Sequence, residues 1–151
     1  MNKVTELELV ARPRKATIAC WIAAVAVVAG STFAATAMRG LTEGGGVFHA
    51  ADQYAMIGLG LLFGAGILLF TRPRVWVSAD EVVVRNAIGS YRLPWEVVMA
   101  VKFPKGASWA QLELADDDVV SVMAIQATDK DRAVVAVRRL REALDAHRGK
   151  A

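Results

Sequence analysis

Two long apolar runs without a charged residue, at positions 16–38 and 53–71, lie close together in the first half of the chain. A helix rises about 1.5 Å per residue, so each run would form a helix of roughly 30 Å, the thickness of the hydrocarbon core of a bilayer. Hydrophobic residues make up 55% of the chain, and the excess over an ordinary soluble protein falls in these two runs. The sequence therefore predicts two transmembrane helices followed by about 80 residues, enough for one small domain.

Basic residues flank the two runs unevenly. Four precede the first run and two follow the second: Lys3, Arg12, Arg14, Lys15, Arg72 and Arg74. The segment between the runs holds a single basic residue, Arg39. Loops that are rich in lysine and arginine next to transmembrane helices lie on the cytoplasmic side. We therefore expect a multi-pass protein of the cell (inner) membrane with both termini in the cytoplasm. Its predicted parts are a cytoplasmic segment, 1–15, a transmembrane hairpin with a short external loop, 16–71, and a cytoplasmic domain, 72–151.

The first run also has features of a cleavable signal peptide, because a basic start precedes it and Ala35-Thr36-Ala37 lies near its end. It is longer than a typical signal core and a second run follows almost at once, so we expect it to be retained; cleavage is the alternative. Cys20, the only cysteine, lies inside this run, and the chain therefore cannot form an intrachain disulfide.

Small residues recur at helical spacing in both runs and are candidate helix–helix contacts: Ala26, Gly30 and Ala34 in the first, Gly60 and Gly64 in the second. Small side chains let helix backbones approach closely in lipid. We expect the two helices to pack on each other; the alternative is that a glycine face receives another subunit. Neither run contains a charged residue, which argues against an ion channel, proton path or transporter.

Short segments of alternating polarity, separated by turn residues, follow the second run and predict six or seven antiparallel strands. The clearest lie at 75–78, 82–86, 91–93, 97–103, 109–114 and 119–125. Pro94 favours an edge or a strand end at that point, and we expect Trp95 to anchor the core beside it.

An amphipathic helix is predicted to close the chain. Thr128 and Asp131 have the spacing of a capping box at its start. Its apolar face comprises Ala133, Val137, Leu140 and Leu144. Three arginines, Arg138, Arg139 and Arg141, are expected on the solvated face, with contact to anionic lipid as the alternative, and His147 near a frayed end. The fold class is therefore α+β: a transmembrane hairpin followed by a curved antiparallel sheet or open barrel that the last helix caps.

Several segments of the soluble part carry a resemblance to a known family: Arg72-Pro73-Arg74-Val75, Val84-Arg85-Asn86, Arg92-Leu93-Pro94-Trp95-Glu96-Val97, Leu112-Glu113-Leu114-Ala115-Asp116, Ala124-Ile125-Gln126 and Leu140-Arg141. In these the chain resembles the bacterial, actinobacterial-type PH-like domain family, also called the low molecular weight protein antigen 6 family. Members commonly carry two membrane spans before the domain. The resemblance implies a PH fold and no established reaction. Inositide-binding PH domains have basic residues around the first hairpin, whereas Asp80-Glu81 is acidic here, so inositide binding is not carried over.

Catalytic constellations are missing from the sequence. The soluble part has no cysteine, no Ser/His/Asp set, no phosphate-binding glycine loop and no cluster at metal-ligand spacing. The run Asp116-Asp117-Asp118 is expected to be a polar turn and His49 a solvated loop residue, with a cation site as the alternative for each. We therefore expect no enzyme, no cofactor, no metal, and no catalytic or cofactor-binding residue.

These observations predict a non-enzymatic, membrane-anchored PH-like interaction or scaffold protein at the cytoplasmic face of the membrane. The alternative is an accessory subunit of a larger integral membrane complex, held through its helices. The expected partners are membrane lipids and a protein whose identity the sequence leaves open; no nucleic acid and no small-molecule substrate are expected. Candidate contacts to lipid headgroups are Arg72, Arg74, Lys102 and Lys105.

Overall fold

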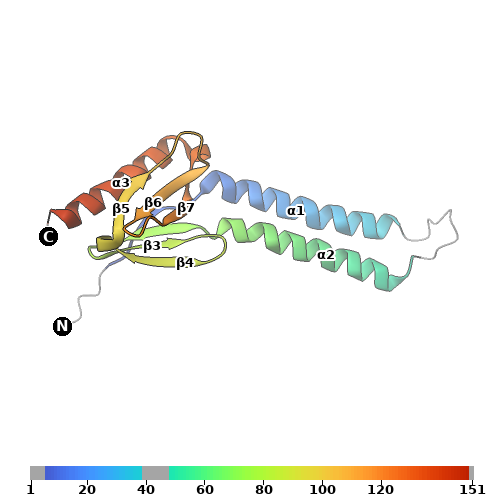
Figure 1. The fold of residues 1–151 in the computed structure, drawn as a ribbon. Helices are drawn as coiled ribbons and strands as arrows, with labels where there is room; N and C mark the ends of the chain where they lie inside the picture. Colours follow the sequence, from blue (N-terminus) through green and yellow to red (C-terminus); the bar gives the residue numbers. More distant parts are fainter. Residues whose placement is uncertain (1–5, 39–47, 150–151) are drawn as a thin grey trace. The chain divides into compact units, whose positions relative to one another are not determined.

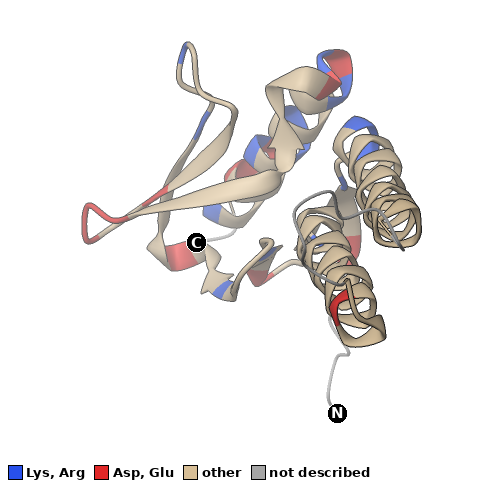
Figure 2. Ribbon diagram, turned by 90° about the vertical axis from the view of Figure 1, so that its right-hand side faces the viewer, with Lys and Arg blue, Asp and Glu red and all other residues tan. Residues whose placement is uncertain are grey.

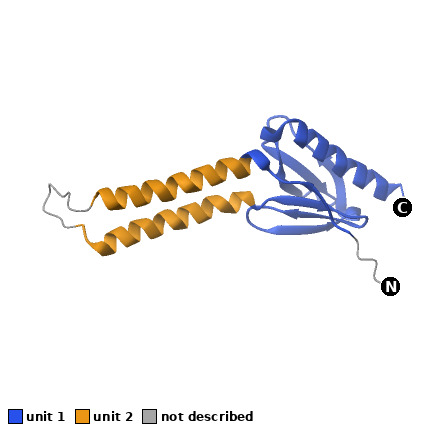
Figure 3. Cartoon of the chain, turned by 180° about the vertical axis from the view of Figure 1, so that it is seen from behind, with its two compact units in different colours: residues 1–15, 72–151 blue, residues 16–71 orange. Residues whose placement is uncertain are grey.

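A computed structural model describes residues 6–38 and 48–149 of the chain (Figure 1). The chain divides into two compact units (Figure 3). Unit 1 contains residues 1–15 and 72–151, and unit 2 contains residues 16–71. The second unit is therefore an insertion in the sequence of the first.

Two α-helices account for most of the described part of unit 2. Helix α1 spans Arg14–Ala37 and α2 spans Ala50–Leu68, which a 3-10 turn extends over Leu69–Thr71. They begin two and three residues before the predicted runs. Both carry charge in the first turn alone (Figure 2), and both are long and apolar enough to cross a membrane, with a mean hydropathy of 2.0. Most of their large apolar side chains are exposed within the chain, as a lipid-facing surface requires: examples are Ile22, Phe33, Leu62 and Phe63.

The two helices of unit 2 pack through the glycines of α2. A Cβ atom added at Gly60 would lie 2.5 Å from Oγ of Ser31, and one added at Gly64 would lie 3.0 Å from Cγ2 of Val28. Ser31 tolerates this apolar contact because its hydroxyl donates to the carbonyl oxygen of Val27, 2.8 Å away within α1. The absence of side chains at the two glycines is therefore what allows this close approach.

Two of the three small residues proposed for α1, Ala26 and Gly30, lie away from the face that packs, whereas Ala34 is partly buried. Gly30 has no atom within 4 Å of an added Cβ, Ala26 is exposed, and the fully buried small residues are Ala24 and Ala35. Helix α1 has two small-residue faces in its sequence, and periodicity alone does not distinguish them. The face that includes Ala24, Val28 and Ser31 is the one that contacts α2.

The close contact at the α2 glycines leads to a prediction with an internal control. Replacing Gly60 and Gly64 together by Leu should destabilise the hairpin, since overpacking costs about 1–3 kcal/mol per site, and should lower the abundance of the protein in membranes several-fold. Replacing Gly58 and Gly66 by Leu adds the same bulk where nothing lies within 4 Å and should leave abundance unchanged. Quantitative immunoblots of membrane fractions measure both.

Equal loss in the two variants would contradict the packing. A Gly58/Gly66 variant that stays abundant but no longer migrates with a larger complex on native gels would favour the accessory-subunit alternative.

The described residues of unit 1 form seven strands and one α-helix. The first sheet has the order β1-β2-β3-β4 and the second the order β5-β6-β7, and all neighbours are antiparallel. The strands are β1 Glu8–Ala11, β2 Arg74–Val77, β3 Glu81–Arg85, β4 Ser90–Pro94, β5 Val98–Lys102, β6 Trp109–Leu114 and β7 Val119–Gln126. A 3-10 turn, Trp95–Val97, separates the sheets just after Pro94. The predicted α+β class and all six predicted strands are confirmed.

Strand β1 corrects the predicted domain boundary. Residues 1–15 were expected to form a separate segment and the domain to begin at Arg72, but β1 pairs with β2, with Leu9 opposite Trp76 and Ala11 opposite Val75. A strand of four residues has too weak a pattern to be recognised alone and exists because β2 offers it a partner. The two ends of the hairpin are thus connected to neighbouring strands of one sheet.

Helix α3, Asp131–Arg148, packs on the strands of unit 1 and completes its core. The predicted apolar face is confirmed, because Ala133, Val137, Leu140 and Leu144 are buried together with Ala136. They meet the inward side chains of the strands: Val75, Val82, Val84, Val98, Val101, Ala110, Leu112, Val120, Val122 and Ala124. The strands supply their alternate residues, as the period of two requires.

The start of α3 differs from the prediction. A 3-10 turn, Ala127–Asp129, precedes it, and its N-cap residue is Lys130, with φ of +46°. The predicted capping box of Thr128 and Asp131 is therefore wrong; the hydroxyl of Thr128 lies 3.4 Å from Oε1 of Gln126 instead. The 3-10 turn places Asp129 in the interior, where it is 8% exposed.

Asn86 joins the two sheets of unit 1. Its side-chain amide donates to the carbonyl oxygen of Ser121 at 2.8 Å and accepts from the backbone N–H of Met123 at 3.1 Å. The side chain thus imitates one residue of a strand paired with β7. Asn86 belongs to a segment that carried the family resemblance, and its role there is structural.

Candidate functional site

The four predicted lipid contacts belong to two separate sheets. Arg72 precedes β2 and Arg74 is its first residue, opposite Arg85. Lys102 ends β5, and its ammonium group forms an ion pair with the carboxylate of Glu113 on β6. Lys105 lies in the turn that follows β5. All four are exposed. Because its charge is already balanced, Lys102 is the weakest of them as a contact for an anionic surface.

A groove of about 440 Å³ lies elsewhere in unit 1, between β1, the end of β7 and the first half of α3. Its apolar lining includes Val10, Ile125 and Ala136. Its charged lining consists of four arginines and two aspartates: Arg12, Arg14, Arg132, Arg139, Asp129 and Asp131. The groove therefore joins residues from opposite ends of the chain.

Most of the charge in this groove is uncompensated. Arg139 forms an ion pair with Glu8 of β1, with 3.5 Å between Nη1 and Oε1. Arg12, Arg14 and Arg132 form no ion pair or side-chain hydrogen bond with the described residues. Free guanidinium groups over an apolar floor are suited to bind a phosphate or carboxylate.

Asp129 is the most unusual residue of the groove. It is 8% exposed, and its Oδ1 atom has no hydrogen-bond partner among the described residues. Buried polar atoms are normally paired, because an unpaired one loses the hydrogen bonds that it makes with water. Because Asp129 also lines the groove, its carboxylate adds negative charge to a lining that is otherwise rich in arginine.

Local sequence patterns did not reveal this groove. In the sequence, Arg12 and Arg14 have the pattern of membrane-topology signals, and Arg139 has that of a solvated helix face. The three come together because β1 pairs with β2 and lies beside α3, a contact between residues more than 100 positions apart. The one local signal was the concentration of arginine at both ends of the chain.

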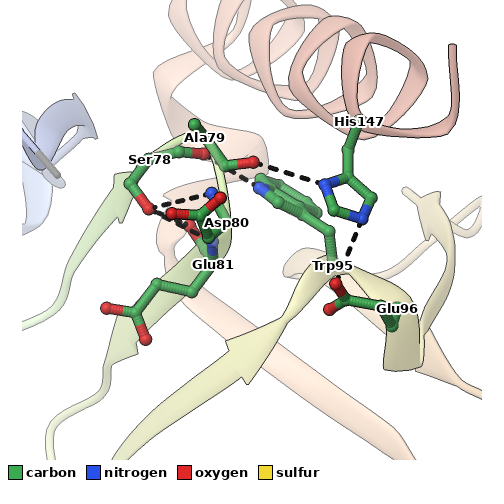
Figure 4. Close-up of polar contacts among 7 residues, drawn as sticks. All are labelled: Ser78, Ala79, Asp80, Glu81, Trp95, Glu96 and His147. Atoms are coloured by element: carbon green, nitrogen blue, oxygen red, sulfur yellow. Dashed lines mark hydrogen bonds and ion pairs between the residues drawn. The ribbon is translucent and has the colours of Figure 1, made fainter. Parts of the chain in front are cut away.

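Trp95 anchors a polar cluster just after the C-terminal end of β2, where Ser78 follows the strand (Figure 4). The indole is 2% exposed, and its N–H donates to the carbonyl oxygen of Ser78 at 2.9 Å. The hydroxyl of Ser78 accepts in turn from the backbone N–H of Glu81 at 3.1 Å and closes the turn between β2 and β3. The predicted anchoring role of Trp95 beside Pro94 is confirmed, and it is structural.

His147 belongs to the same cluster, although it was predicted to lie near a frayed end. Its Nδ1 atom lies 3.3 Å from the carbonyl oxygen of Ala79, and its Nε2 atom lies 3.4 Å from Oε1 of Glu96 (Figure 4). The last turn of α3 is thereby tied to the β2–β3 turn and to the segment after β4. Ser78 carries the one hydroxyl in Figure 4, and this hydroxyl is hydrogen-bonded to the backbone of Asp80 and Glu81 and not to His147. The described residues contain no group of three or more His, Cys, Asp or Glu that could hold a metal.

The comparisons with known proteins agree with this architecture. A family model described as a bacterial PH domain matches residues 72–143. Uncharacterized proteins of Mycobacterium tuberculosis and Mycobacterium bovis are 43% identical over 136 residues, which cover 90% of this chain and 85% of theirs. The chain belongs to the bacterial PH domain family. No solved structure matches it.

The match to the bacterial PH domain begins at Arg72, so it includes β2 to β7 and most of α3 but excludes β1. The mycobacterial relatives align over nine-tenths of the chain, which extends the likeness into the hairpin. PH domains as a class are non-catalytic interaction modules, and neither comparison indicates an enzyme family.

Two arginines of α3 cover one edge of this PH domain. Nε of Arg141 donates to the carbonyl oxygen of Val101 at 3.0 Å, and Nη2 of Arg148 donates to that of Met99 at 2.6 Å. Both acceptors belong to β5, the edge strand of the second sheet. An added peptide strand would need these carbonyl groups, so the arginines oppose strand addition at β5. Arg138, Arg139 and Arg141 are all exposed, in agreement with the predicted solvated face, and Arg141 in addition makes the hydrogen bond to Val101.

Proposed function

We propose that this bacterial PH domain is a membrane-anchored, non-catalytic interaction module that works at the cytoplasmic surface of the cell membrane. Its partners are lipid headgroups and a protein that it holds near the bilayer. The observation that carries the proposal is the insertion of two apolar helices between β1 and β2, which are paired neighbours in one sheet.

This insertion supports a two-span topology on physical grounds. Since Ala11 and Val75 are partners in the sheet, the segments before α1 and after α2 must be on the same side of the membrane. An even number of crossings meets this condition, and a single crossing does not. Cleavage near Ala35 would remove β1 from the sheet, so the pairing favours retention of the first helix. Basic residues on both flanks favour the cytoplasm as the shared side.

Cysteine accessibility tests this topology. In a Cys20→Ala background, Gly45→Cys, which lies outside the described residues, should react with a membrane-impermeant maleimide in intact cells. Gly149→Cys should react at least tenfold less until the membrane is permeabilised. The Cys20→Ala chain alone measures the background. The reverse labelling pattern would reject the orientation, and release of the chain from membranes by alkaline carbonate would reject the anchoring.

A further inference from the structure

We propose that the groove between β1, the end of β7 and α3 binds the headgroup of a phospholipid that carries a phosphodiester and a terminal ammonium group, as in phosphatidylethanolamine. The inference deepens the proposed function, on which it rests, by naming the class of lipid that the domain recognises. It places recognition at this groove, away from Arg72, Arg74, Lys102 and Lys105.

Three arginines of the groove are placed to bind the phosphate group. Arg12, Arg14 and Arg132 have no partner among the described residues, and a guanidinium group matches two phosphate oxygens with two parallel N–H donors. Arg132 is the second residue of α3, where the free backbone N–H groups of an 18-residue helix add positive potential. Arg139 is held by Glu8 and adds less.

The carboxylate of Asp129 attracts the ammonium group. It is nine-tenths buried, its Oδ1 atom lacks a donor, and none of the arginines in the groove forms an ion pair with it. Asp131 adds a second negative charge to the same lining. A purely anionic ligand would bring like charge to Asp129 and Asp131, whereas an ammonium group brings opposite charge and three N–H donors to this part of the lining.

The location and size of the groove favour a lipid as the source of this headgroup. Arg12 and Arg14 precede the apolar run at Ala16 by at most four residues, so the chain itself keeps this lining close to the membrane surface. A volume of about 440 Å³ is in the range of sites for small ligands, and it accommodates a headgroup while the acyl chains stay outside.

Native mass spectrometry of the full chain in a neutral detergent tests the proposal. Short-chain phosphatidylethanolamine, phosphatidylcholine and phosphatidylglycerol are titrated separately. We expect phosphatidylethanolamine to bind about tenfold more tightly than the other two, because choline has no N–H donor, glycerol has no positive charge, and a charged hydrogen bond has about this effect. Equal binding of the three lipids would overturn the proposal.

Matched variants locate the effect in the groove. Asp129→Asn should bring phosphatidylethanolamine to within about twofold of phosphatidylcholine, since the amide no longer attracts the ammonium group. Arg132→Gln should weaken phosphatidylethanolamine and phosphatidylglycerol together, about tenfold. Arg138→Gln makes the same change on an exposed part of α3 outside the groove and should bind like the parent. Circular dichroism melting establishes that each variant is folded. A folded Asp129→Asn chain that kept the full preference for phosphatidylethanolamine would refute the role of Asp129. Arg132 is exposed, so Arg132→Gln tests the site without disturbing the core.

Soluble glycerophosphoethanolamine separates this proposal from the proposed function. If the groove recognises the headgroup, this compound should displace the lipid, whereas lipid that merely surrounds the helices should remain bound and would overturn the headgroup site. A chain that carbonate releases from membranes but that binds glycerophosphoethanolamine would refute the membrane anchoring and support the groove.

Discussion

Leu140→Asp should unfold unit 1 while leaving α1 and α2 helical. Leu140 is completely buried in the core that α3 shares with the strands. Removing a buried leucine costs about 2–5 kcal/mol, and an unpaired buried carboxylate adds several more, while a whole domain has a stability of only about 5–15 kcal/mol. Loss of the near-ultraviolet circular dichroism signal of the full chain in detergent, with far-ultraviolet helicity partly retained, measures the effect.

Val134→Asp is the control for this substitution. Val134 lies on the same helix but is 59% exposed, so the same change should alter the free energy of unfolding by less than about 0.5 kcal/mol. A Leu140→Asp chain that melts at the temperature of the parent would show that α3 is not packed on the sheets.

A fragment that begins at Arg72 should fail to give a stable monomer, because it lacks β1. Residues Val10 and Ala11 pack against the core beside Val75, and β1 occupies the hydrogen-bonding edge of β2. Their loss removes roughly 3–5 kcal/mol of hydrogen bonding and apolar burial and exposes a strand edge that can pair with other chains. Size-exclusion chromatography of the fragment 72–151 should show aggregates.

A fused chain that restores β1 without the hairpin is the matched control. Residues 6–13 joined to 72–151 by a Gly-Ser linker of about four residues should give a soluble, cooperatively melting monomer, since paired strands lie about 5 Å apart. Gly residues in place of Leu9, Val10 and Ala11 should abolish this rescue. A fragment 72–151 that melts like the fused form would contradict the contribution of β1.

Much of the molecule can be predicted from local patterns in the chain. The two uncharged runs predict the helices of unit 2, because each run is long enough and apolar enough to form a helix that could cross a bilayer. Alternating apolar residues locate β2 to β7 to within one or two residues. The helical spacing of Leu140 and Leu144 identifies the buried face of α3, and Pro94 before Trp95 marks the end of β4. Each of these features depends on residues near one another in sequence, which is where periodicity is informative.

Tertiary structure decided the features that join distant parts of the chain. Strand β1 is too short to be recognised before β2 is present to pair with it. The face of α1 that packs on Gly60 is one of two that the sequence offers, and contact alone selects it. The groove exists because β1 brings Arg12 beside the start of α3, where the 3-10 turn buries Asp129. The sequence by itself therefore determined which elements form and which are apolar, whereas pairing and packing determined where charges from opposite ends of the chain meet, because those distances depend on the fold and not on sequence separation.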